Sequence, residues 1–195
     1  MSGIIRCLSA DDRVPMSWKN GGGVTTEIAC YPTGASLDAF GWRVSLADVL
    51  QPGPFSLFQG VDRTLVVLSG NGIRLHVDGD APRHLTQSSA PFAFPADVPA
   101  DAALIDGPIV DLNVMTRRRA WRHTIERLDI EGRCDVPNGA PEWLMFCHQG
   151  AVRVETQAGV LAIAPKDAVY GTGAIASVIA VEAKPVVFHI AIWPC

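Results

Sequence analysis

Proline and glycine interrupt this chain so often that only short regular elements fit between them. The 195 residues include 14 prolines and 18 glycines, and the intervening segments are rich in valine, isoleucine, leucine and threonine. The hydrophobic spacing of a long amphipathic helix is scarcely visible. Many short strands separated by turns predict an all-β sandwich or barrel.

The strand and turn signals of the first half are followed by a similar series in the second half. Gly70–Gly72 separates two predicted strands as a tight hairpin signal, and Gly150 ends a later strand in the same way. This order, rather than residue identity, indicates two related barrels. We predict them at residues 1–118 and 119–195, packed closely as one globular unit. The predicted strands are residues 24–29, 42–46, 63–68, 73–77, 109–115, 143–150, 151–155 and 186–193.

The composition narrows the class of protein. Hydrophobic residues make up 48% of the chain, which supplies a substantial core. The net charge is −4, and the one basic run, Arg117–Arg119, is interpreted as a solvated turn, so we expect no nucleic-acid partner. Without a signal peptide or a long apolar run, we expect no membrane partner. Five widely spaced cysteines without a C-x-x-C pair indicate reduced thiols and a cytoplasmic protein.

Alternation along the first-half strands places polar side chains on one face of each strand, amid apolar neighbours. If the sheet closes, these faces converge in the mouth of the barrel. The result is a mostly apolar cup with a few polar groups, which is the composition of a small-molecule pocket. The alternative is that these side chains simply face solvent. The polar residues concerned are Thr25, Glu27, Arg43, Ser45, Arg63, Asp111 and Asn113.

Met16–Glu27 is the second dense cluster of polar and glycine residues. Three consecutive glycines let the backbone approach a ligand and turn its N–H groups inward. Trp18 adds a flat apolar wall, Lys19 a positive charge and Asn20 an adaptable amide. The P-loop pattern is missing, and a flexible surface loop is the alternative interpretation.

Catalytic motifs are sparse. No G-x-S-x-G elbow occurs, and the five histidines show no metal-ligand spacing. His189, alone on an apolar strand, is interpreted as a core residue. Cys147 and His148 are neighbours that point to opposite faces of a strand, although a cysteine–histidine nucleophile stays open. We therefore assign no catalytic residue, no metal ligand and no cofactor.

Residues 55–70 resemble the first half of a cupin motif whose metal ligands have been replaced. The paired histidines are missing, and Arg63 lies close to where a carboxylate ligand would be. A guanidinium repels a divalent metal and attracts a carboxylate. The wider pattern resembles the HutD family, also called Ves-like proteins, over about residues 14–122. The motifs are W-K-N-G-G-G-V-T-T-E-I-A (18–29), F-G-W-R-V-S-L-A-D-V (40–49), G-P-F-S-L-F-Q-G-V-D-R-T-L-V-V-L-S-G (53–70), P-F-A-F-P-A-D (91–97) and D-G-P-I-V-D-L-N-V-M-T-R-R (106–118).

The resemblance implies a bicupin, with two jelly-roll type barrels and without the usual metal site. It also implies an association with histidine utilisation, in which the protein binds a pathway intermediate and limits flux. The second barrel is expected to be structural or interfacial. The predicted ligand-binding residues, on the family's motifs and their flanks, are Trp18, Lys19, Asn20, Glu27, Arg43, Ser45, Arg63 and Asn113.

Three hypotheses for function follow. The first is a protein that binds a small anionic metabolite, urocanate or formiminoglutamate, without turnover. The second is a hydrolase or isomerase acting on a histidine-derived intermediate, with Glu27 as general base if burial raises its pKa. The third is an interaction protein that forms a homodimer through Val186–Trp193, for which a core strand is the alternative.

Overall fold

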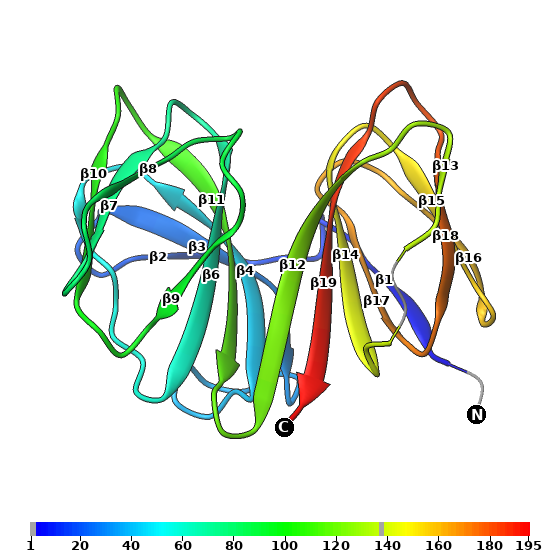
Figure 1. Cartoon of the computed structure of the whole chain (residues 1–195), viewed down its shortest axis with the longest axis horizontal. Helices are drawn as coiled ribbons and strands as arrows, with labels where there is room; N and C mark the ends of the chain where they lie inside the picture. The colour runs from blue at the N-terminus through cyan, green and yellow to red at the C-terminus, as the bar shows by residue number, and fades with distance from the viewer. Residues whose placement is uncertain (1–2, 137–138) are drawn as a thin grey trace. The chain divides into compact units, whose positions relative to one another are not determined.

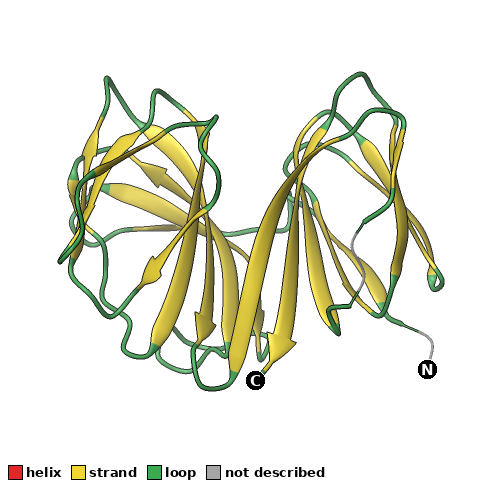
Figure 2. Ribbon diagram, in the orientation of Figure 1, coloured by secondary structure: helices red, strands yellow, loops and turns green. Residues whose placement is uncertain are grey.

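Strands, turns and loops make up the whole described part of the chain (Figure 2). The computed structural model describes residues 3–136 and 139–195, and no helix occurs within them. The described chain forms two compact units, one from residues 13–122 with Cys195 and one from residues 3–12 with 123–136 and 139–194. Each unit contains two antiparallel sheets, so the prediction of an all-β chain with two barrels is confirmed.

The first barrel consists of a six-stranded sheet and a four-stranded sheet (Figure 1). Their inner faces share one apolar cluster that includes Leu65, Leu75 and Phe94. In spatial order, the larger sheet contains β2 (Pro15–Ser17), β3 (Gly23–Tyr31), β4 (Trp42–Val49), β11 (Ile109–Arg117), β6 (Val61–Ser69) and β9 (Phe92–Pro95). The smaller sheet contains β5 (Gly53–Pro54), β10 (Ala100–Leu104), β7 (Ile73–Val77) and β8 (Arg83–Leu85).

The pairing register of β4, β11 and β6 determines which side chains lie together on the inner face of the larger sheet. β11 is central, so each of its inward residues has a partner on both sides. The rows are Arg43–Met115–Arg63, Ser45–Asn113–Leu65 and Ala47–Asp111–Val67. The two arginines therefore share one row, and the amide and the acid occupy the next two.

The second barrel also has a larger and a smaller sheet (Figure 1). Its larger sheet contains β1 (Ile5–Leu8), β17 (Ala168–Thr172), β14 (Glu142–Gln149), β19 (Val186–Pro194) and β12 (Trp121–Asp129). Its smaller sheet contains β13 (Arg133–Cys134), β18 (Ile175–Ala180), β15 (Val152–Thr156) and β16 (Gly159–Ile163).

The predicted division of the chain differs from these units at two places. Ile5–Leu8 pairs with β17, so the start of the chain belongs to the second barrel rather than the first. The first barrel extends to residue 122, beyond the predicted boundary at 118. The prediction missed β12 because its polar sequence carries few apolar residues, although its burial alternates along the strand.

Gly70–Gly72 does not close a hairpin, contrary to the prediction. β6 and β7, which it connects, belong to different sheets of the first barrel, so the turn is a corner between sheets. Both of its glycines have positive φ values, 86° and 106°, which favour glycine. At Gly70 an added Cβ would also lie 2.4 Å from the carbonyl oxygen of Pro108.

Two other segments for which a prediction was made, residues 186–193 and the basic run, have structural roles in the fold. β19 lies between β14 and β12, so both of its edges are hydrogen-bonded within the sheet, as expected of a core strand. His189 is buried on it, and burial lowers its pKa to about 4. The basic run leads into a turn at residues 118–120, as predicted. Its side chains are not simply solvated, because Arg117 donates to the Phe40 carbonyl and Arg118 pairs with Asp62 at 2.7 Å.

Candidate functional site

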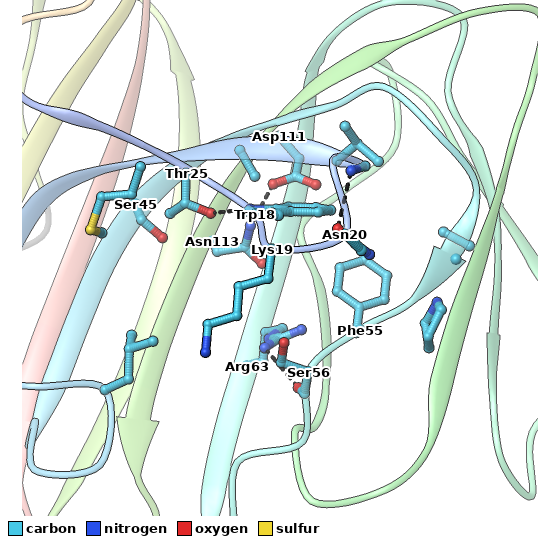
Figure 3. Close-up of a pocket in the computed structure, with 18 of the residues that line it drawn as sticks. Trp18, Lys19, Asn20, Thr25, Ser45, Phe55, Ser56, Arg63, Asp111 and Asn113 are labelled. Carbon is cyan, nitrogen blue, oxygen red and sulfur yellow. Dashed lines mark hydrogen bonds between the residues drawn. The ribbon is translucent and has the colours of Figure 1, made fainter.

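A cavity of about 680 Å³ opens in the first barrel (Figure 3). Its size suits a small metabolite. Its lining includes seven of the eight predicted ligand-binding residues, so the structure brings these seven together; Glu27 is not among the lining residues. The seven are Trp18, Lys19, Asn20, Arg43, Ser45, Arg63 and Asn113.

Arg63 on β6 presents a buried guanidinium to this cavity. The residue is 4% exposed, and its Cζ lies over the rings of Phe55, Phe58 and Phe94 at 5.1, 5.4 and 5.7 Å. A cation at this distance is attracted by the negative charge on the faces of aromatic rings. Burial lowers its pKa to about 10, so the group is still positively charged at neutral pH.

The hydrogen bonds of Arg63 are few and long. Its Nη2 lies 3.4 Å from the Ser56 carbonyl oxygen and 3.5 Å from the Met115 sulfur. Its Nε is buried without a hydrogen-bond partner, and among the described residues no carboxylate forms an ion pair with it. A buried cation without an ion-pair partner is costly, so Arg63 is a strong candidate to hold an anion.

Arg43 on β4 differs from Arg63 because it has a carboxylate partner. Its Nε donates to Glu27 at 2.8 Å, and its Nη1 donates to Ser45 at 3.3 Å. Glu27 lies opposite Ser45 in the β3–β4 register, and its side chain is 32% exposed. The carboxylate therefore orients a cavity arginine from the same face of the sheet without itself belonging to the cavity lining.

Asp111 and Asn113 on β11 form the polar part of the cavity wall. Asp111 is fully buried and accepts a short hydrogen bond from the Asn113 amide nitrogen. Burial raises the pKa of Asp111 to about 7, an effect that Arg63 and Asn113 oppose and the charge of Asp48 reinforces. The second carboxyl oxygen of Asp111 and the amide oxygen of Asn113 are buried without a hydrogen-bond partner.

The glycine loop supplies one side of the cavity. In Figure 3, Lys19 extends from this loop across the cavity. The expectation that the glycine N–H groups face a ligand is not met at two of the three positions. Gly21 donates to the Trp18 carbonyl at 3.0 Å, and Gly22 donates to the Asn20 side chain at 3.0 Å. The loop uses these donors to hold its own shape, and its side chains face the cavity.

The side chain of Trp18 is held by a hydrogen bond from its indole nitrogen to Thr25 at 2.7 Å. Thr25→Val keeps the side-chain shape and removes the acceptor. Because this leaves a partly buried N–H without its partner, we expect a loss of about 1–2 kcal/mol in the free energy of unfolding, measured by urea denaturation. Thr26→Val, on the opposite face of β3, is the matched control. Equal effects of the two substitutions would contradict this role.

The prediction omitted several residues of the cavity. Asp111 was placed on the correct face by alternation, but its burial depends on the neighbouring strands and was not evident. Phe55 and Phe58 lie outside regular strands, so alternation gave no signal for them. A test for aromatic residues near Arg63 in the chain would have found both, since a buried guanidinium favours aromatic neighbours.

In the parts of the chain that the structure describes, no cluster of side chains suits metal binding or cysteine chemistry. No group of three histidine, cysteine, aspartate or glutamate side chains could hold a metal within residues 3–136 and 139–195. The five cysteines lie in these ranges and form no disulfide. Cys147 is buried in the second barrel, and burial raises its pKa to about 12. The described residues also include no helix able to cross a membrane.

Comparison with known proteins decides the family. The family model for HutD matches residues 10–188. The chain belongs to the HutD family. An uncharacterized 21.2 kDa protein in the hutC 3′ region of Pseudomonas putida is 38% identical over 150 residues, 77% of each chain. Protein Ves of Cronobacter sakazakii is 38% identical over 113 residues, 57% of this chain and 60% of that protein.

Two solved structures with more than 30% sequence identity have the same fold. A conserved protein of unknown function from Pseudomonas aeruginosa PAO1 is 36% identical, covers 97% of this chain and 99% of its own, and superposes with a TM-score of 0.87. HutD from Pseudomonas fluorescens SBW25, in a formate condition, is 31% identical and covers 98% and 100%, with a TM-score of 0.83.

More distant structures identify the wider fold class. An oxalate decarboxylase variant from Bacillus subtilis is 9% identical and has a TM-score of 0.66 over 95% of this chain and 76% of its own. At this identity the likeness shows the fold alone. The predicted cupin-like, jelly-roll architecture is confirmed.

Proposed function

We propose that this protein binds a small carboxylate metabolite of histidine utilisation, of the urocanate or formiminoglutamate class, in the cavity of its first barrel. The observation that carries the proposal is Arg63. Its guanidinium is buried in the cavity wall, and its Nε has no hydrogen-bond partner among the described residues. A ligand carboxylate supplies the balancing charge and accepts hydrogen bonds from the guanidinium edge.

The charges around the cavity favour an anion over a cation. Arg43 is balanced by Glu27 at 2.8 Å, whereas Arg63 has no such partner among the described residues. Asp111, whose pKa is raised to about 7 by burial, is only partly ionised at neutral pH. Exposed Lys19 adds another positive charge to the lining. The sum is positive, and it becomes more so as the pH falls.

Membership of the HutD family supports the pathway part of the proposal. The Pseudomonas putida relative is described by its place in the hutC 3′ region, and the Pseudomonas fluorescens relative is named HutD. A protein that holds a pathway metabolite also senses its concentration. We propose that binding limits the flux through histidine utilisation in this way.

Calorimetric titration of the purified protein with urocanate and with formiminoglutamate tests the proposal. We expect saturable 1:1 binding by at least one of the two acids, weakened by salt because a charged pair forms. Histamine, which has the imidazole ring and no carboxylate, is the matched control and is expected not to bind. The proposal is overturned if neither acid binds, and saturable binding of histamine would contradict the preference for an anion.

The enzyme hypothesis can be tested on the same samples. The geometry does not favour Glu27 as a general base, because its carboxylate accepts from Arg43 and is not part of the cavity lining. Chromatography of each acid after long incubation at high protein concentration measures turnover directly. Turnover that disappears in Glu27→Gln would establish the enzyme in place of the binding protein.

A further inference from the structure

Two buried acceptor atoms in the cavity wall have no role in binding a carboxylate. They are the second carboxyl oxygen of Asp111 and the amide oxygen of Asn113, and neither has a hydrogen-bond partner among the described residues. Asp111 is 0% exposed and Asn113 is 8% exposed. Both line the cavity. Buried acceptors are normally paired with donors, so a ligand that enters the cavity is the natural source of a donor.

The strand register separates these acceptors from the guanidinium groups. Arg43 and Arg63 flank Met115, whereas Asn113 and Asp111 lie one and two rows further along β11. Rows on one face of a strand are spaced roughly 7 Å apart, which is the scale of a small metabolite. Figure 3 shows the Asp111–Asn113 pair apart from Arg63, which lies beside Ser56. The cavity therefore has a donor end and an acceptor end.

The acceptor end is not another anion site. The Asn113 amide nitrogen donates to Asp111, so the amide oxygen and the remaining carboxyl oxygen are the atoms left to interact with a ligand. When Asp111 is ionised, a carboxylate placed there would meet lone pairs and a like charge. An N–H group meets two acceptors, and its hydrogen bond to an ionised carboxyl is of the stronger, charge-assisted kind.

We propose that Asp111 and Asn113 form a second subsite that binds an N–H donor, so that the ligand is a small carboxylate with an N–H group at its other end. This inference rests on the proposed function, because it takes Arg63 as the carboxylate site. It adds a selection rule: the cavity discriminates among carboxylates of the same size by the donor they carry. An imidazole, amidine or amine satisfies the rule, and an ether oxygen or a methyl group does not.

A pair of matched ligands tests the inference on the unmodified protein. Urocanate and 3-(2-furyl)acrylate have the same acrylate carboxylate and a five-membered ring, but only urocanate has a ring N–H. We expect urocanate to bind at least ~10-fold more tightly, because a site built to accept a hydrogen bond rejects an analogue that lacks the donor. Calorimetry at one pH and one salt concentration measures both affinities.

Two variants locate the discrimination. Asn113→Leu is expected to reduce the preference for urocanate to about 3-fold or less. Met115→Leu, in the neighbouring row, is expected to change both affinities alike and keep their ratio. If Asn113→Leu does not fold, the comparison of the two ligands on the unmodified protein still decides.

The outcomes separate the two proposals. Equal binding of urocanate and furylacrylate overturns the second subsite and leaves the carboxylate site standing. Tighter binding of furylacrylate overturns the subsite as well. If urocanate, furylacrylate and formiminoglutamate all fail to bind, the proposed function is overturned, and with it the inference that depends on it. If the preference for urocanate is unchanged in Asn113→Leu, other residues distinguish the two ligands. That outcome also counts against the subsite.

Discussion

Replacing Arg63 by alanine is expected to weaken the binding of a carboxylate ligand by ~30-fold to several thousand-fold. The guanidinium is buried among three aromatic rings and has no ion-pair partner among the described residues. Removing one member of a buried charge pair costs about 2–5 kcal/mol, which corresponds to that range of dissociation constants. Calorimetric titration with urocanate measures the change.

Arg63→Lys, the conservative substitution, is also expected to bind a carboxylate ligand more weakly than the unmodified protein does. Lysine keeps the charge, but it lacks the planar fork that stacks on the rings and donates two parallel hydrogen bonds. We therefore expect Arg63→Lys to recover only part of the lost affinity. Arg74→Ala, an exposed arginine on β7 of the same barrel, is the matched control and is expected to bind as the unmodified protein does. Thermal melts of all three variants establish that they are folded.

An affinity for urocanate that is unchanged in folded Arg63→Ala would contradict the assignment of the carboxylate site. Equal losses in Arg63→Ala and Arg74→Ala would also contradict it, because they would indicate a long-range effect of net charge. The two variants distinguish a local effect at the cavity from a general effect of net charge, since the two arginines lie in the same barrel and differ in burial.

The fold and the inner face of the site were predictable because both depend on local alternation. A strand turns every second side chain to the same face, so Arg43 with Ser45, and Asp111 with Asn113, could be placed together without coordinates. Antiparallel pairing with β11 then brings them to adjacent rows. The structure places all four residues in the lining of one cavity.

The remaining features depend on contacts between distant parts of the chain. Ile5–Leu8 joins the second barrel by pairing with β17, more than 150 residues away, and its own sequence does not specify that partner. Alternation places Glu27 on the correct face, but the ion pair that turns its carboxylate toward Arg43 depends on how β3 and β4 pair in the folded chain. The environment of Asp111 is likewise a tertiary property, because its burial and its neighbouring charges come from other strands.

The buried carboxyl of Asp111 is expected to destabilise the fold as the pH rises. Burial raises the pKa of this group from 3.8 to about 7, so between these values the folded state binds more protons than the unfolded state. Stability therefore falls with increasing pH from about 4 to about 7 and is constant above that, as far as this group is concerned. At ~1.4 kcal/mol per pH unit, the cost above pH 7 is roughly 4 kcal/mol.

Asp111→Asn removes this cost and is expected to raise the melting temperature by several degrees at pH 8. The asparagine keeps an oxygen that accepts from Asn113, so the local hydrogen bond is retained. At pH 3, where the carboxyl is protonated in the folded state and largely so in the unfolded state, the advantage should nearly vanish. Asp78→Asn, an exposed carboxyl next to the end of β7, controls for the general effect of removing a charge.

A stabilising Asp111→Asn substitution at pH 8 would mean that the protein retains a carboxyl in its cavity at the expense of stability, as binding sites commonly do. The structure offers one use for it, as an acceptor for a ligand donor beside Asn113. If Asp111→Asn is instead destabilising at pH 8, or its effect does not change with pH, the carboxyl is compensated in the folded protein. The electrostatic argument for the second subsite then fails, even if the carboxylate site at Arg63 is correct.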